Sequence, residues 1–240
     1  MSDRAKALRV LAALKRSPVG DSAVLVGSSG LFGFETGVPA LTEDVDVSIP
    51  ESLAEQQGRA IVESLIAQGF EHEPGTATFT DPEGIVFDLL GHGDPEAGDH
   101  IGGTEALHVM VFEDLSRLLK EAVATMDLPQ GGRALTPAGF VASKLLTERA
   151  HKGAKDKIQA LLVLAERQGD QNFMAEVARL LHSAGPLRLD DVRAGAQTAF
   201  LSLERDPTFS DAGAEGYAPV LKQAEIGLEQ LFVLLDSPHG

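Results

Sequence analysis

Two stretches of sequence decide the fold: Ala23-Val24-Leu25-Val26-Gly27-Ser28 and Asp44-Val45-Asp46-Val47-Ser48-Ile49-Pro50. The first is a short apolar run that ends in a glycine turn, a pattern that predicts a buried strand leading into a loop. In the second, valine or isoleucine alternates with polar residues, which predicts a strand with one apolar face. Because Asp44 and Asp46 are two residues apart, we expect their carboxylates to lie on the same face of that strand.

The sequence on either side predicts the rest of an α/β unit. Apolar residues recur at helical spacing over 3–16 and 52–68, which predicts two helices. The turn sequence Asp81-Pro82-Glu83-Gly84 separates two apolar segments and predicts a hairpin. Asp88 lies in the second strand of that hairpin and could bring a third carboxylate to the first two. Residues 91–103 are polar and rich in glycine, and are predicted as a loop. The other elements predicted in this half are a strand over 107–112 and a helix over 113–126.

The second half of the chain is predicted to be helical. Thr136-Pro137 offers an N-cap residue followed by proline at the first helical position, and the helix that starts there is expected to run through Lys144 and Arg149. Glycine and proline breaks separate further predicted helices over 155–167, 171–184, 190–204 and 215–235. The predicted organisation is therefore an α/β core over residues 1–130 and a helical bundle over residues 131–240.

The composition excludes several classes of protein. The 240 residues include 20 lysines and arginines against 36 aspartates and glutamates, a formal net charge of −16. Such a chain lacks the general basic surface that coats nucleic acids or anionic membranes. The absence of cysteine excludes disulfides, cysteine zinc sites and thiol catalysis. No apolar run reaches the roughly 18 residues of a membrane span, and the first residues lack a secretion signal. We therefore expect a cytoplasmic protein with no membrane partner and no bulk DNA binding.

The charge is distributed unevenly along the chain. Residues 21–115 hold nineteen acidic residues and one basic residue, Arg59, whereas residues 116–160 hold eight basic and four acidic residues. One interpretation is a solvated acidic surface. The other is that some carboxylates converge on metal ions, with compensating cations supplied by residues 116–160. An RNA substrate would have to use the cationic stretch 133–157 or the basic N-terminal helix.

Asp44, Asp46 and Asp88 together suggest a specific chemistry. Three carboxylates around two Mg²⁺ ions suit in-line transfer at phosphorus, in which one metal activates the attacking oxygen and the other holds a triphosphate. The Gly27-Ser28 turn would let backbone N–H groups approach a phosphate without interference from side chains.

These residues also resemble a known family. Gly27-Ser28, the Thr-x-Asp-Val-Asp pattern at 42–46 and Phe87-Asp88-Leu89-Leu90 resemble the DNA polymerase beta nucleotidyltransferase superfamily. Within that superfamily the chain is similar to the minimal and AbiEii-type bacterial nucleotidyltransferases, whose second half carries a lysine in a helix, then an arginine and a Lys-Asp pair. Lys144, Arg149 and Lys155-Asp156 match that pattern, so the resemblance covers roughly residues 22–160.

The resemblance implies a nucleotidyltransferase-type mixed sheet core with a C-terminal helical domain. It also implies roles for individual residues: Asp44, Asp46 and Asp88 as ligands of Mg²⁺, and Gly27, Ser28, Lys144 and Arg149 in contact with the nucleotide. By the polymerase-like pattern the activating acid is Asp88, and by the AbiEii-type pattern it is Asp156. Both alternatives stay open on the sequence alone.

The implied function is Mg²⁺-dependent transfer of a nucleoside monophosphate from an NTP, ATP among them, to a hydroxyl acceptor. The acceptor could be an RNA end, a protein side chain or a small molecule. AbiEii-type relatives imply the toxin of a toxin–antitoxin pair, with a cognate antitoxin protein as partner. The alternative, from another class, is a non-catalytic module of the same fold that binds a nucleotide or a protein.

Overall fold

The computed structural model describes residues 3–38, 40, 44–147, 153–184, 186–205 and 214–236. The chain forms two compact units. The first, here called the sheet unit, comprises Met1–Glu35 and Ala40–Thr136; the second, the helical unit, comprises Thr36–Pro39 and Pro137–Gly240. Each unit is described by itself.

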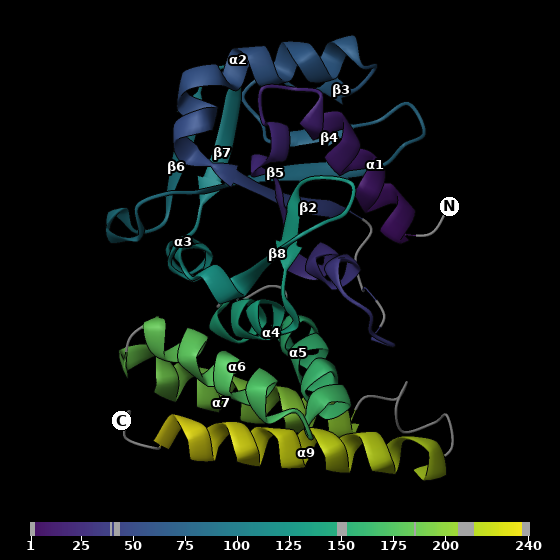
Figure 1. Ribbon diagram of the computed structural model, residues 1–240, viewed down its shortest axis with the longest axis vertical. Helices are drawn as coiled ribbons and strands as arrows, with labels where there is room; N and C mark the ends of the chain where they lie inside the picture. The colour runs from purple at the N-terminus through teal and green to yellow at the C-terminus, as the bar shows by residue number, and fades with distance from the viewer. Residues whose placement is uncertain are drawn as a thin grey trace. The chain divides into compact units, whose positions relative to one another are not determined.

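The sheet unit is built on one mixed sheet (Figure 1). Its described strands are β1 (Val24–Leu25), β2 (Val45–Pro50), β3 (Glu71–His72), β4 (Thr78–Thr80), β5 (Val86–His92), β6 (His100–Thr104), β7 (Leu107–Val111), β8 (Thr125–Asp127) and β9 (Arg133–Leu135). The order is β3-β4-β5-β2-β1-β9-β8, with β7 also beside β5 and β6 beside β7. Strand β2 runs parallel to β5, β5 to β7 and β1 to β9, and the other pairs are antiparallel.

Helices complete the sheet unit. They are α1 (Asp3–Lys15), α2 (Glu51–Ala67) and α3 (Glu113–Lys120), with the short 3₁₀ helices η1 (Gly20–Ser22), η2 (Gly27–Gly33), η3 (Pro95–Ala97) and η4 (Ala122–Ala124). The predicted hairpin at 81–84 is present, since β4 and β5 pair antiparallel on either side of it. In its turn, Asp81 accepts hydrogen bonds from the backbone N–H groups of Glu83 and Ile85, both at 2.8 Å. Such a carboxylate satisfies the backbone donors that a tight turn leaves unpaired.

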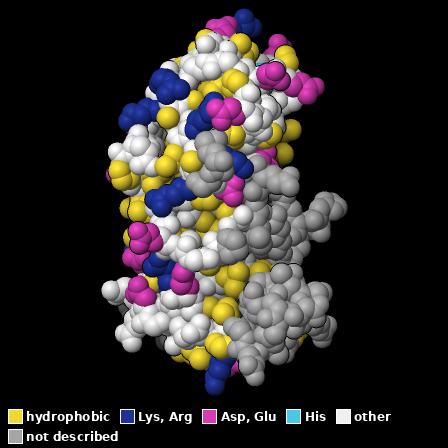
Figure 2. Space-filling model, turned by 90° about the vertical axis from the view of Figure 1, so that its right-hand side faces the viewer, with side chains coloured by type: hydrophobic (Ala, Val, Ile, Leu, Met, Phe, Trp, Pro, Cys, Tyr) yellow, Lys and Arg dark blue, Asp and Glu magenta, His cyan; other side chains and the backbone are white. Residues whose placement is uncertain are grey.

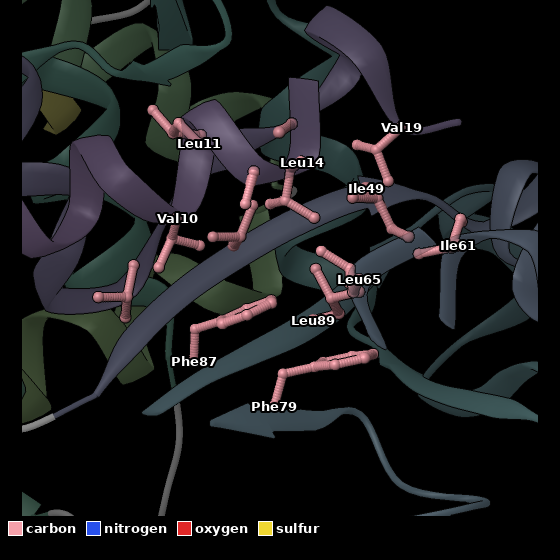
Figure 3. Close-up of a cluster of buried hydrophobic side chains, with 14 of the residues drawn as sticks. Val10, Leu11, Leu14, Val19, Ile49, Ile61, Leu65, Phe79, Phe87 and Leu89 are labelled. Atoms are coloured by element: carbon pink, nitrogen blue, oxygen red, sulfur yellow. The ribbon is translucent and has the colours of Figure 1, made fainter. Parts of the chain in front are cut away.

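One face of the sheet is buried against α1 and α2 (Figure 3). Phe79 of β4 and Phe87 of β5 stack there with ring centroids 5.0 Å apart, and both side chains are fully buried. Leu14 of α1 and Leu65 of α2 belong to the same cluster. Because side chains alternate along a strand, burying these apolar residues turns the polar residues of β2 and β5 to the opposite face.

The helical unit consists of packed α-helices. Those described are α4 (Pro137–Leu146), α5 (Gly153–Arg167), α6 (Gln171–Ser183), α7 (Pro186–Arg205) and α9 (Ala214–Asp236). Glycine permits a close crossing of two of them: a Cβ on Gly227 of α9 would lie 3.2 Å from the carbonyl oxygen of Leu164 in α5. Segment 36–38 joins this unit because Glu166 of α5 accepts hydrogen bonds from the hydroxyl of Thr36 and the N–H of Gly37.

The predicted fold class is confirmed: an α/β core with a mixed sheet, followed by a helical region. Within the described ranges, no helix has both the length and the apolar character that a membrane crossing requires. The chain thus has the architecture that its hydrophobic patterns predict.

Four local predictions are wrong. The helix expected to run from Pro137 through Lys144 and Arg149 ends at Leu146, because Thr147 already lies outside it. The helix predicted over 113–126 ends at Lys120, and residues 125–127 form β8. The predicted loop 91–103 contains the end of β5, η3 and most of β6. The region predicted to be wholly helical includes β9, which pairs with β1 in parallel. Strand β9 gains its hydrogen bonds from β1, which is distant in the sequence, and local propensity does not register such a partner. Strands β6 and β8 instead pair antiparallel with the strands that follow them, β7 and β9.

Candidate functional site

Three carboxylates converge on the polar face of the sheet. Asp44 directly precedes β2, Asp46 lies within it, and Asp88 lies on β5. The parallel register of the two strands places Asp46 opposite Asp88. Each of the three acids offers an oxygen, and these oxygens lie within 4.8 Å of one another at half-buried positions. The structure therefore brings together the three acids that the sequence singled out.

Gly27 makes room for one of these carboxylates. It begins η2 with φ +56°, in the left-handed region that side chains with a Cβ seldom occupy. A Cβ at this position would lie 2.1 Å from a carboxylate oxygen of Asp46. Backbone geometry and space thus both require glycine here, which gives the predicted Gly-Ser turn a physical reason.

Ser29 holds the backbone that carries Asp44 and Asp46. Its hydroxyl accepts a hydrogen bond from the N–H of Asp46 at 3.2 Å and lies 3.5 Å from the carbonyl oxygen of Asp44. The side chain is completely buried. The neighbouring Ser28, expected from the resemblance to contact a phosphate, is 5% exposed. The role of Ser29 is not predicted from the sequence, because two adjacent serines in one turn carry no signal that tells them apart.

Thr78 contacts the third acid. It is exposed on β4, directly opposite Asp88 in the antiparallel register. Its hydroxyl donates a hydrogen bond of 2.5 Å to one carboxylate oxygen of Asp88. The sequence analysis assigned no role to this residue either.

The donor set suits a hard divalent cation. Carboxylate oxygens are the preferred protein ligands of Mg²⁺ and Ca²⁺, and oxygen atoms within 4.8 Å of one another can share one such ion or a close pair. Asp44, Asp46 and Asp88 form the one group of this kind among the residues that the structure describes. Gly27 adds space beside the cluster rather than a competing side chain. The residues present therefore fit a divalent metal site.

A polar pair lies further along the same face. Ser48 is two residues beyond Asp46 on β2, and its hydroxyl is 2.8 Å from Nδ1 of His92 on β5. Burial, together with the positive charge of Arg133, lowers the pKa of His92 from its ordinary 6.5 to about 4. His92 is thus neutral at physiological pH. Val24 of β1 is paired with Ser48 on one side and with Arg133 of β9 on the other. Arg133 therefore supplies a cation to the same face of the sheet.

The helical unit pairs two further predicted site residues. Lys144 in the last turn of α4 donates a hydrogen bond of 2.5 Å from Nζ to Asp156 in the first turn of α5. Both residues are buried, at 5% and 9% exposure. A cation at a helix C-terminus and an anion at a helix N-terminus are each favoured by the helix dipole. The ammonium of Lys144 therefore already has a carboxylate partner, although the sequence analysis expected it to contact the nucleotide.

Some predicted site residues lie outside the described part of the chain. Arg149, expected in contact with the nucleotide, falls between residues 147 and 153, and Thr42 of the Thr-x-Asp-Val-Asp pattern falls between residues 40 and 44. The side chain of Lys155 is likewise not described. Their roles stay predictions.

Comparison with known proteins adds little to this geometry. No family model matches the chain, and no curated protein matches it significantly. Among solved structures, the chain is similar to one described as "putative nucleotidyltransferase from H. pylori", with 12% sequence identity, a TM-score of 0.49 and coverage of 100% of both chains. Similarity at that level assigns neither the fold nor the activity, so the function has to be argued from the residues of this chain.

Proposed function

We propose that the protein is a Mg²⁺-dependent nucleotidyltransferase that transfers a nucleoside monophosphate from an NTP to a hydroxyl acceptor and releases pyrophosphate. The observation that carries the proposal is the convergence of Asp44, Asp46 and Asp88 within 4.8 Å, beside a glycine whose backbone conformation leaves space for them. The family resemblance of the same residues points to the same chemistry.

The residues of the sheet unit have distinct parts in the proposed reaction. Asp44, directly before β2, and Asp46, within β2, would hold the cation, with Asp88 completing the ligand set. A divalent cation bound there supplies Lewis-acid stabilisation of the charge that develops on the phosphate oxygens. Gly27 begins a segment whose backbone N–H groups can approach a phosphate without a side chain in the way. The bond from the acceptor oxygen to the α-phosphorus forms as the bond to pyrophosphate breaks.

Asp88 is the better candidate for the activating acid. It belongs to the three-acid cluster, so an acceptor hydroxyl held near the metal would lie within its reach. Asp156 instead belongs to the helical unit, where it accepts a hydrogen bond from Lys144, and it is not part of the three-acid cluster. We therefore assign proton removal to Asp88 and an orienting role in the helical unit to Asp156.

Surface charge favours a small-molecule or protein acceptor over RNA. On α1, Lys6 pairs with Asp3 and Lys15 with Asp21. Arg9 pairs with both Asp81 and Glu83. Among the side chains drawn in colour in Figure 2, basic ones lie beside acidic ones. Cations that are already paired gain less from a phosphate backbone. A toxin–antitoxin role rests on the family resemblance alone.

Labelled nucleotide tests the proposal. Each NTP, labelled on the α-phosphorus or on the γ-phosphorus, is incubated with the protein, Mg²⁺ and total cell extract, which is then separated into RNA, protein and small-molecule fractions. We expect one fraction to gain α-label but not γ-label, and the Asp46→Asn variant to lose that transfer. Equal incorporation by Asp46→Asn would refute the proposed site, and γ-label in the product would indicate a kinase instead.

One observation favours a non-catalytic module of the same fold, which binds a nucleotide or a protein, as the second candidate. Lys144 is the cation expected at the triphosphate, yet its Nζ is 2.5 Å from Asp156 in a buried position. Calorimetry discriminates the two functions. Nucleotide binding that needs Mg²⁺ and disappears in Asp46→Asn supports the transferase, whereas nucleotide binding unaffected by Mg²⁺, or no nucleotide binding at all, supports the module.

A further inference from the structure

The side chain of Asp88 is held by a residue from a neighbouring strand. The hydroxyl of Thr78 lies 2.5 Å from one oxygen of Asp88, whereas the other two acids of the cluster come from β2 and the residue before it. Thr78 belongs to β4, on the opposite side of β5 from β2. Thr78 therefore contacts Asp88 from the strand on one side of β5, whereas Asp44 and Asp46 lie on or next to the strand on its other side.

The sheet fixes Thr78 firmly in that place. Phe79, the next residue, is fully buried and stacks on Phe87, so its own side chain anchors β4 to the core. On the other side, the carbonyl oxygen of Ala77 accepts a hydrogen bond from the N–H of Leu89 at 2.9 Å. Both neighbours of Thr78 thus contact β5. Because side chains alternate between the two faces along a strand, the side chain of Thr78 points to the face that carries Asp88. The β-branched side chain adds stiffness, because χ1 of threonine is restricted.

A hydrogen bond of this kind prepares a carboxylate to bind a cation. The two oxygens of an ionised carboxylate have about four acceptor positions, so a bond from one hydroxyl leaves the others for a metal. Fixing the orientation before the ion arrives removes part of the entropy that binding would otherwise cost. Groups that orient metal ligands typically contribute about 10- to 100-fold to metal affinity. Thr78 is exposed, so a contribution near the lower end is expected.

We propose that Thr78 is a positioning residue for the divalent metal site: its hydroxyl fixes the carboxylate of Asp88 in the orientation in which that acid joins Asp44 and Asp46. This inference rests on the proposed function, because it requires the three acids to bind a cation. The residue does not touch the reacting atoms. Its effect passes through Asp88, and it concerns the affinity for metal more than the chemical step.

Mn²⁺ binding to the full-length protein tests the proposal without an acceptor or a nucleotide. The free metal is followed by electron paramagnetic resonance as MnCl₂ is titrated into wild type, Thr78→Val, Thr78→Ser and Thr80→Val. Thr80 is the matched control, because it lies on the same strand and face but pairs with Val86 rather than an acid. Urea unfolding of each variant shows whether the fold is kept, and Thr78→Ala replaces Thr78→Val if the valine is not tolerated.

The expected result is a dissociation constant for Mn²⁺ raised about tenfold in Thr78→Val, and within twofold of wild type in Thr78→Ser and Thr80→Val, with similar unfolding midpoints throughout. If Thr78→Val binds Mn²⁺ as Thr80→Val does, the positioning role is wrong while the metal site stands. If Thr78→Ser is as weak as Thr78→Val, the hydroxyl is not the group responsible and the inference is overturned. If wild type binds no Mn²⁺, the proposed function and this inference fail together.

Discussion

Replacing Gly27 with alanine should have two consequences, one for stability and one for the position of Asp46. The first is backbone strain: at φ +56° a residue with a Cβ costs roughly 1–2 kcal/mol of stability. The second is displacement of Asp46, a proposed metal ligand. The new Cβ would lie 2.1 Å from a carboxylate oxygen of Asp46, so that oxygen must move by about 1 Å to restore ordinary contact. A shift of that size at an active site can cost about 100-fold in rate.

Gly20 provides a control for the first consequence. Its φ is +59°, and a Cβ there would meet nothing within 4 Å. Gly20→Ala should therefore lose about 1–2 kcal/mol of stability in urea unfolding from backbone strain alone, and Gly27→Ala should lose at least as much, because its Cβ also meets the side chain of Asp46. Only Gly27→Ala should also lose at least tenfold in Mn²⁺ affinity. Equal Mn²⁺ affinities for the two variants would show that the contact between residue 27 and Asp46 does not set the geometry of the site.

Three further predictions concern stability. Ser29→Ala removes the hydroxyl that accepts a hydrogen bond from the partly buried N–H of Asp46, and should cost about 1–3 kcal/mol in urea unfolding. An unchanged unfolding midpoint would argue against this contact. Lys144→Met leaves the buried carboxylate of Asp156 without its cation and should lower the free energy of unfolding by about 3–5 kcal/mol. Most of that stability should return in the double variant that also replaces Asp156 with leucine. A single variant as stable as wild type would contradict the buried ion pair. The pKa of His92 is lowered from 6.5 to about 4 in the folded protein, so between these pH values the unfolded chain binds a proton that the folded protein does not. The free energy of unfolding should therefore fall by about 3 kcal/mol as the pH drops from 6.5 to 4. His92→Gln should flatten this pH dependence, and a profile unaltered by the substitution would count against the lowered pKa.

The centre of the site could be predicted because its residues follow simple rules. Alternation along residues 44–50 places two carboxylates on one face, and the turn at 81–84 places Asp88 on a strand with an apolar opposite face. The prediction needed only that these two strands be neighbours in the sheet. The parallel pairing that sets Asp46 opposite Asp88 is a tertiary property, and the sequence alone did not specify it.

The residues that support the site could not be predicted for the same reason. Thr78 matters only because β4 pairs with β5 in one particular register, and a shift by one residue would turn it to the other face. Ser29 matters because η2 turns its hydroxyl toward the backbone of β2. Lys144 and Asp156 lie on two different helices, and their pairing depends on how those helices pack. The cationic stretch in which the sequence predicts a contact with phosphate therefore contains the buried ion pair of Lys144 and Asp156.

The proposed transfer chemistry depends on Asp44, Asp46 and Asp88 holding a divalent cation together. Anomalous diffraction from crystals soaked in Mn²⁺ measures this directly, because it locates the ion relative to each carboxylate. We predict an anomalous peak within about 2–2.5 Å of oxygens from these three residues, and no such peak in crystals of Asp46→Asn. A well-ordered site with no peak between the three carboxylates, or with a peak held elsewhere on the chain, would contradict the proposed function.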